Sequence, residues 1–293
     1  MKKNRTIKSI IHTEMFYMGG FPVRQAFPSN KVEALDPFLL LHHANVKVPT
    51  HIPTTQAGVG PHPHRGFSPV TFIFKGGVHH RDSRGNDSII YQGGTQWMNA
   101  GMGIIHSERP PQNIHELGGV QEIIQLWVNT PAKHKMDQPQ YLPASKEEIP
   151  FIELPNQLGR INIIAGELNQ VKGIIPTLSP VNSFTAQLKQ GASFYLPIPL
   201  SHNAFIYVLS GSLQVETATS TDEILEHYVA IFDSNGEGTC FTALSDAEIF
   251  IGTGQPLNEP IASHGPFVMN NQTQILEAFK DYQQGKMGVL IED

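Results

Sequence analysis

The chain has 293 residues, of which 40% are hydrophobic and 16% charged, so it can form one large or two ordinary globular domains. Its net charge of −6 and pI near 6.1 argue against a broad basic surface for nucleic acid, and no apolar stretch reaches the ~18 residues of a membrane span. The single cysteine, Cys240, cannot form a disulfide within the chain, and no apolar secretory signal follows the N-terminus. We therefore expect a cytoplasmic protein that contacts neither nucleic acid nor membrane directly.

Short apolar runs separated by turn residues fill most of the chain. Glycine and proline supply 26 and 22 residues, which suits many strands joined by tight turns better than long helices. Residues 6–27 contain short strand-like runs, and the apolar run at 38–41 predicts a buried strand that His42 and His43 close. Residues 44–60 resemble a loop. An all-β fold is the expectation.

The stretch at 61–67, PHPHRGF, carries the candidate site. His62 and His64 are two residues apart, so both imidazoles project to one face of an extended strand. The later segment GIIHSERP repeats this spacing with His106 and Glu108. Two neighbouring strands would bring three imidazoles and one carboxylate to a common point. We predict one metal ion bound by these four residues.

A strand expected at 68–75 follows the two histidines directly. Val70, Phe72 and Phe74 share the parity of His62 and His64, and so share their face if no bulge intervenes. This pattern predicts an apolar wall beside the metal.

The rest of the chain divides into recognisable segments. Residues 78–94 predict a hairpin with its turn near Gly85, and residues 136–160, which are irregular, are interpreted as a linker. The second half alternates short apolar runs with turns. It ends in a helix that Asn271 or Thr273 can cap and Gly285 can end. The apolar residues of that helix are Ile275, Leu276, Phe279 and Tyr282.

The two halves match at a constant shift of 135 positions, which pairs Gly76 with Gly211 and Gly103 with Gly238. At this shift the four predicted ligands correspond, in chain order, to Pro197, Pro199, Phe241 and Ala243. The turn glycines persist while the ligands do not. We therefore expect a single metal site, in the first of two related β-units.

Several segments resemble the pirin family. They are HPHRGF, GGTQWMNAGMGIIHSE, HGPFVMN, DYQQGKMG, LDPFLL and the HRDSRG segment at 80–85. The resemblance implies two tandem cupin (jelly-roll) β-barrels: residues 1–135 as an N-terminal metal-binding barrel, 136–160 as a linker, and 161–293 as a metal-free C-terminal barrel with a short C-terminal helix. It also implies one iron held by His62, His64, His106 and Glu108.

The resemblance leaves the activity open. Some bacterial pirins resemble quercetinases, which open a flavonol ring with O2, and a mammalian pirin is an iron-dependent transcription cofactor. Three imidazoles and a carboxylate suit Fe(II), which we favour, as well as Mn, Co, Ni or Zn. We expect a dioxygenase acting on a small aromatic substrate of the flavonol type, with Glu108 as ligand and proton acceptor. The alternatives are a regulator that binds a protein partner and another cupin chemistry, such as isomerisation.

Overall fold

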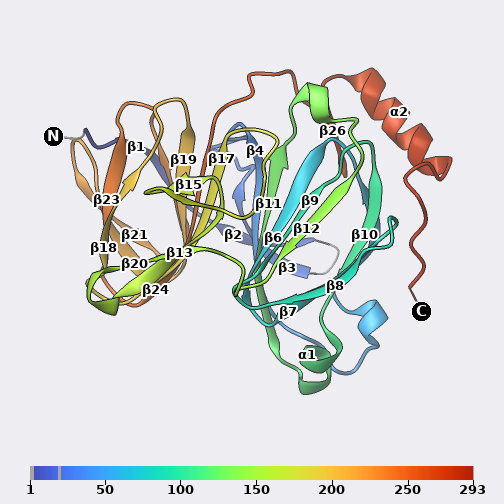
Figure 1. Ribbon diagram of the computed structural model, residues 1–293, viewed down its shortest axis with the longest axis horizontal. Helices are drawn as coiled ribbons and strands as arrows, with labels where there is room; N and C mark the ends of the chain where they lie inside the picture. The colour runs from blue at the N-terminus through green and yellow to red at the C-terminus, as the bar shows by residue number, and fades with distance from the viewer. Residues whose placement is uncertain (1–2, 19–20, 293) are drawn as a thin grey trace. The chain divides into compact units, whose positions relative to one another are not determined.

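The computed structural model describes residues 3–18 and 21–292, and strands dominate it (Figure 1). Contacts within the chain define two compact units. The N-terminal barrel unit comprises Tyr17–Val23, Phe38–Glu147 and Leu257–Asp293. The C-terminal barrel unit comprises Met1–Phe16, Arg24–Pro37 and Glu148–Pro256. Each unit is therefore assembled from three separate stretches of the chain, whereas the sequence boundaries at 135 and 160 divide it in chain order.

The N-terminal barrel unit is built on two antiparallel sheets. The strands are β2 (Glu14–Met18), β3 (Phe21–Phe27), β4 (Phe38–Lys47), β5 (Val59–His64), β6 (Phe67–Lys75), β7 (Gly77–Asp82), β8 (Asp87–Tyr91), β9 (Thr95–Asn99), β10 (Ile104–Arg109), β11 (Val120–Asn129) and β12 (Gln140–Ala144). The large sheet has the order β12-β9-β6-β11-β4-β3-β2, and the small sheet has the order β5-β10-β7-β8. Only parts of β2 and β3 belong to this unit.

Shorter elements complete the N-terminal barrel unit. They are the single turns η1 (Thr54–Gln56) and η2 (Ala132–His134), the helix α1 (Gln112–Leu117), the pair β25 (Ala262–His264) and β26 (Phe267–Met269), and the helix α2 (Gln272–Gln283). The expected C-terminal helix is confirmed as α2, which is red in Figure 1. Asn271 caps it by accepting a hydrogen bond from the Gln274 backbone N–H at 3.0 Å. Leu276, however, is exposed rather than packed.

The C-terminal barrel unit repeats this architecture. Its strands are β1 (Ile7–His12), β13 (Phe151–Glu153), β14 (Gly159–Ala165), β15 (Glu167–Leu168), β16 (Val171–Lys172), β17 (Val181–Leu188), β18 (Ser193–Pro197), β19 (Asn203–Ser210), β20 (Ser212–Glu216), β21 (Thr221–Leu225), β22 (Tyr228–Phe232), β23 (Gly238–Ala243) and β24 (Ala247–Gly254), with the turn η3 (Pro155–Gln157). The large sheet has the order β1-β22-β19-β24-β17-β14-β13, and the small sheet has the order β18-β23-β20-β21. The all-β expectation is therefore confirmed.

The two units differ in what lies between their sheets. In the C-terminal barrel unit, buried apolar side chains from both sheets form one continuous cluster, with Phe184 and Ile206 from the large sheet meeting Leu213 and Phe241 from the small sheet. In the N-terminal barrel unit, a cavity of about 510 Å³ lies among residues of both sheets. The region between the sheets is thus a close-packed apolar core in the C-terminal barrel unit, whereas the N-terminal barrel unit has a cavity of ligand size there.

Three local expectations need correction or addition. The strand expected to close at His42 and His43 runs on to Lys47, because both histidines are buried and pair with β11 across the sheet. The segment interpreted as an irregular linker contains β12, which pairs with β9, and β13, which pairs with β14. Pro143 is tolerated in β12 because that strand lies at a sheet edge. The expected hairpin is confirmed as β7 and β8.

No helix among the described residues is both long and apolar enough to cross a membrane.

Candidate metal centre

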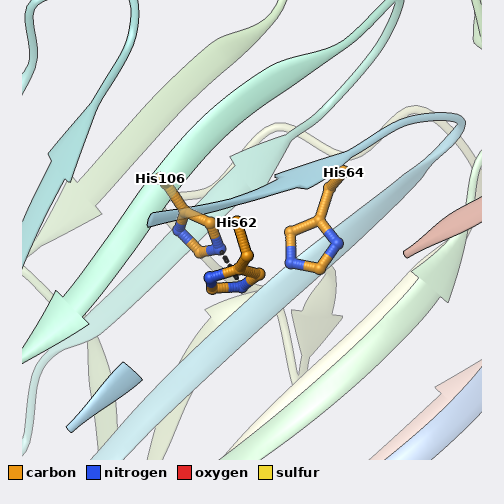
Figure 2. Close-up of side chains that lie close together, drawn as sticks. All are labelled: His62, His64 and His106. Atoms are coloured by element: carbon orange, nitrogen blue, oxygen red, sulfur yellow. Dashed lines mark hydrogen bonds between the residues drawn. The ribbon is translucent and has the colours of Figure 1, made fainter. Parts of the chain in front are cut away.

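Three histidines meet where β5 and β10 lie side by side (Figure 2). The antiparallel register places His106 opposite His62 and Ile104 opposite His64. The imidazoles of His62, His64 and His106 project to the same side, and their ligand nitrogens all lie within 4.8 Å of one another. The i, i+2 spacing in β5 and the strand pairing together produce the cluster that the sequence predicted. This cluster can hold a metal ion.

The hydrogen bonds of His62 leave one nitrogen available inside the cluster. Its Nδ1 lies 2.7 Å from the Gly60 carbonyl oxygen, which can only accept, so this nitrogen carries the proton. Nε2 of His62 therefore presents a lone pair to the centre of the cluster. Orientation of a ligand histidine by a backbone carbonyl is common at metal sites.

His80 and Asp82 orient His106 so that its Nε2, like that of His62, lies inside the cluster. Its Nδ1 lies 3.4 Å from Nδ1 of His80, and Nε2 of His80 lies 2.9 Å from a carboxylate oxygen of Asp82. Burial alone would raise the pKa of Asp82, but hydrogen bonds from His80, Asn86 and backbone N–H groups outweigh burial and lower it. Asp82 thus accepts from His80, His80 accepts from His106, and Nε2 of His106 keeps its lone pair.

Two lone pairs consequently face each other. Nε2 of His106 and Nε2 of His62 lie 3.1 Å apart, and with these tautomers neither carries a proton to donate. Such an arrangement is repulsive until a cation or proton lies between or beside the two nitrogens. The donor set of this cluster therefore fits a bound metal ion better than a hydrogen-bonded pair of histidines.

His64 gives a second, independent indication. It is buried, and neither ring nitrogen has a hydrogen-bond partner of good geometry among the described residues. Burial, and then the charge of His62, lower the pKa of His64 well below its usual value, against a smaller opposing effect of the Pro266 carbonyl. Burial and the neighbouring histidines also lower the pKa of His106. Both rings are thus kept neutral, which is the form that binds metals.

Glu108, the fourth predicted ligand, lies near the triad but outside it. The group of ligand atoms within 4.8 Å of one another contains the three histidines and not this carboxylate. Its Oε1 accepts a hydrogen bond from Thr71 Oγ1 at 2.5 Å, and its Oε2 accepts one from Gln125 Nε2 at 2.7 Å. Each oxygen retains a further lone pair. Glu108 lines the same cavity as His62 and His64, so its role as a ligand stays a prediction.

The cavity of about 510 Å³ opens beside the triad and lies in the range of small-molecule sites, about 300–1,000 Å³. Two strands of the large sheet supply much of its lining with alternate residues: Leu40, His42 and Ala44 from β4, and Gln121, Ile123, Gln125 and Trp127 from β11. These residues went unrecognised in the sequence, although their period of two is the signal that would have found them. The remaining lining is mostly apolar and includes Phe21 and Val59.

The apolar wall expected from β6 is wrong. Val70, Phe72 and Phe74 are buried but do not line the cavity, and Thr71, of opposite parity, contacts Glu108. The reason is the turn at Gly66, whose φ of +85° lets the chain leave the small sheet and enter the large one. Parity does not carry across a turn of this kind.

Two ion pairs hold the metal-bearing strands against the C-terminal segment. Arg65, the residue after β5, donates to the Met102 carbonyl and to Asp281 in α2. Arg109, the last residue of β10, donates to Glu292 at 2.6 Å. Met287, which lies between Asp281 and Glu292 in the chain, is fully buried. The C-terminal segment therefore supports the strands that carry the histidines.

The strand pairing also shows how the second barrel differs. In the C-terminal barrel unit, Phe241 lies opposite Phe194 and Thr239 opposite Leu196. With Phe241 at the position of His106, the counterparts of His62 and His64 are Phe194 and Leu196, so the constant shift of 135 residues is wrong by three positions in this strand. Neither residue offers a metal ligand, and both belong to or pack against the apolar cluster.

Comparison with known proteins agrees with this architecture along the whole chain. Residues 20–128 match the Pirin family, and residues 183–288 match the Pirin C-terminal cupin domain. Pirin from Rattus norvegicus is 33% identical over 286 residues, covering 96% of this chain and 92% of that protein. A Pseudomonas aeruginosa protein that carries a provisional name as a quercetin 2,3-dioxygenase is 38% identical over 271 residues, covering 91% of this chain and 92% of that protein.

Solved structures extend the comparison. A quercetin 2,3-dioxygenase from Acinetobacter baumannii is 38% identical, with a TM-score of 0.89 over 99% of this chain and 100% of that one. A bacterial pirin from Escherichia coli, solved in complex with nickel(II), shares the fold at 16% identity, with a TM-score of 0.65 over 85% of this chain and 100% of that one. With both cupin domains matched and relatives above 30% identity along nearly its whole length, the chain belongs to the pirin family.

Proposed function

We propose that the protein is an Fe(II)-dependent dioxygenase of the quercetinase type, acting on flavonol-like aromatic substrates. The observation that carries the proposal is a triad of converging histidines beside a largely apolar cavity of ligand size. The relatives named as quercetin 2,3-dioxygenases support the reaction class. The cavity supports a small-molecule substrate more directly than it supports a protein partner.

His62, His64, His106 and Glu108 would hold the metal, and a bound iron would supply the electronic chemistry that lets O2 react with an aromatic ring. Nickel is named with the Escherichia coli pirin, so metal identity is a separate question from metal binding. Elemental analysis of the purified protein answers it.

Glu108 is the proposed proton acceptor for the substrate hydroxyl group. Thr71 and Gln125 each donate one hydrogen bond to its carboxylate, which fixes the orientation of the group and leaves lone pairs free to receive a proton. Gln125 is itself held, because its amide oxygen accepts from Trp127 Nε1 at 3.3 Å. A base held in this way loses little conformational freedom when the substrate binds.

The cavity walls would orient the ring system and exclude water. Leu40, Ala44, Ile123 and Trp127 offer flat apolar contact from two neighbouring strands. His42 adds one polar side chain among them, and burial lowers its pKa to about 4, so it stays neutral at physiological pH. An uncharged polar wall suits a substrate with hydroxyl groups and no net charge.

The test is turnover by iron-loaded protein of verified metal content. A flavonol panel should show loss of the flavonol absorbance together with matched O2 consumption, and His64→Ala should abolish both. Absence of turnover at full iron occupancy across the panel would overturn the dioxygenase proposal. Metal-dependent capture of a protein partner, unaffected by a bulky substitution at Ala44, would then favour the regulatory alternative. Conversion of a substrate without O2 consumption would favour another cupin chemistry.

A further inference from the structure

The small sheet of the N-terminal barrel unit presents three polar i, i+2 pairs on adjacent strands. His62 and His64 lie on β5, and His106 and Glu108 lie on β10. The third pair, on β7, lies directly beside the second, with Asp82 opposite His106 and His80 opposite Glu108. His80 and Asp82 are 2% and 4% exposed. Two buried polar side chains that are not predicted ligands therefore lie against the strand that carries two of them.

Hydrogen bonds and a stacked ring fix the orientation of both Asp82 and His80. Asp82 accepts from His80 Nε2 at 2.9 Å, from Asn86 Nδ2 at 2.8 Å and from the Arg84 backbone N–H at 2.8 Å. The ring of Tyr141 stacks on the His80 ring at 3.9 Å between centroids and an angle of 4°. His80 can therefore neither rotate nor exchange its tautomer freely. Its remaining nitrogen, Nδ1, faces Nδ1 of His106 at 3.4 Å.

The second barrel acts as an internal control. Strand β20 pairs with β23 so that Val215 lies opposite Phe241 and Leu213 opposite Ala243. By this register, Leu213 and Val215 are the counterparts of His80 and Asp82, and both are fully buried in the apolar cluster. The fold therefore forms without this polar pair. It is absent in the barrel whose ligand positions are apolar and present in the barrel that carries the histidines.

We infer that His80 and Asp82 are positioning residues of the metal centre, acting as a carboxylate–imidazole relay that holds His106 with Nε2 toward the ion. Burying two polar groups lowers the stability of the fold, and packing alone does not offset that cost. The benefit lies in the metal site, because the pair fixes the orientation of the His106 ring and makes its ligand nitrogen more electron-rich. The inference rests on the proposed metal site and goes beyond it by assigning residues that do not touch the metal.

Cobalt(II) alone is the probe, because its visible absorption reports the ligand field and its affinity can be measured by chelator competition. His80→Phe keeps a flat ring against Tyr141 but cannot accept a hydrogen bond from His106. Loss of such outer partners typically weakens metal binding about 10–100-fold, and we expect that loss together with shifted cobalt bands. His80→Gln can accept from His106 and donate to Asp82, so it should restore most of both. Tyr141→Phe is the matched control, since it keeps the stacked ring and loses only the hydroxyl that meets Ser88.

Wild-type cobalt binding tests the site, and the variants test the relay, so the two can fail separately. Unchanged cobalt affinity and spectrum in His80→Phe would overturn the inference while leaving the metal site intact. Equal losses in His80→Phe and His80→Gln, with metal-free thermal stability retained, would overturn it as well. Should His80→Phe not fold, the cobalt spectrum of His80→Gln alone decides: a spectrum like that of the wild type supports the relay, and one of a detached His106 refutes it.

Discussion

His64→Leu should have opposite effects on stability with and without metal. In the metal-free protein, His64 buries two ring nitrogens that make no hydrogen bond of good geometry among the described residues. Leaving a buried polar group unsatisfied costs about 1–3 kcal/mol, a cost that an apolar side chain of similar size avoids. Leucine also occupies the corresponding position of the second barrel, as Leu196. The metal-free variant should therefore be about 1–3 kcal/mol more stable than the metal-free wild type.

Bound metal should make the wild type more stable than His64→Leu. At a free metal concentration about 1,000 times the dissociation constant, the wild type gains about 4.1 kcal/mol, which exceeds the metal-free advantage of the variant, whereas a variant with a broken triad gains almost nothing. At about 2–4 °C per kcal/mol for a domain of this size, the two melting curves should exchange places on adding metal. Differential scanning calorimetry with chelator and then with excess Fe(II) or Co(II) measures both differences.

His115→Leu removes another buried histidine of the same unit, but His115 Nε2 is satisfied by the Ile52 carbonyl at 2.7 Å. This control should lose stability and keep its full metal response. If His64→Leu were destabilised without metal, or stabilised by metal as strongly as the wild type, the reasoning from unsatisfied nitrogens would be refuted.

Three further predictions concern the surroundings of the triad. Glu108→Gln should keep metal on the three histidines but reduce turnover at least about 10²-fold, which is the usual contribution of a general base. Glu122 is another buried glutamate but does not line the cavity, so Glu122→Gln should keep its turnover. Equal turnover in both variants, measured by O2 uptake, would contradict the assignment of Glu108 as the base. Burial lowers the pKa of His42 to about 4, while an unfolded histidine titrates near about 6.5, so stability falls as pH drops below the latter value, by about 2 kcal/mol at pH 5. His42→Phe should remove that acid sensitivity in denaturant titrations at pH 7 and 5, and an unchanged difference between the two pH values would refute it. Glu292→Gln removes the charge that pairs with Arg109 at 2.6 Å, so hydrogen exchange should become faster in β10 and stay unchanged in β23. Equal protection of β10 in the wild type and the variant would show that the ion pair does not support this strand.

The sequence predicted the parts of the site that depend on local rules. His62 and His64 converge because side chains at i and i+2 share a strand face. His106 joins them because β10 pairs with β5, although four other strands separate the two in the chain, and the repeated i, i+2 spacing is the signal that suggested this pairing. The terminal helix followed from the Asn271 cap and its apolar spacing. The shared strand face of His62 and His64 and the helix cap need no knowledge of distant contacts, whereas the pairing of β5 with β10 is a long-range contact.

The parts that failed depend on where the chain changes sheets. Phe72 was expected to face the metal, but the positive φ at Gly66 resets the parity, so Thr71 faces the site instead. The constant shift between halves missed Phe194 and Leu196 because the connection after β18 is longer than the one after β5. The cavity lining on β4 and β11 required the sheet order, which a single sequence does not contain.

The division of the chain into discontinuous units has a consequence for its synthesis. Strand β1 pairs with β22, more than 200 residues later, and α2 belongs to the unit whose main body begins at Phe38. During translation, these partners emerge from the ribosome at very different times. Neither unit therefore has all its strands and helices when its central part emerges. Contacts so distant in sequence slow folding and expose apolar surface while they wait. The metal-bearing half should therefore mature last, although it is translated first, and a gene cut at residue 135 would encode an incomplete barrel.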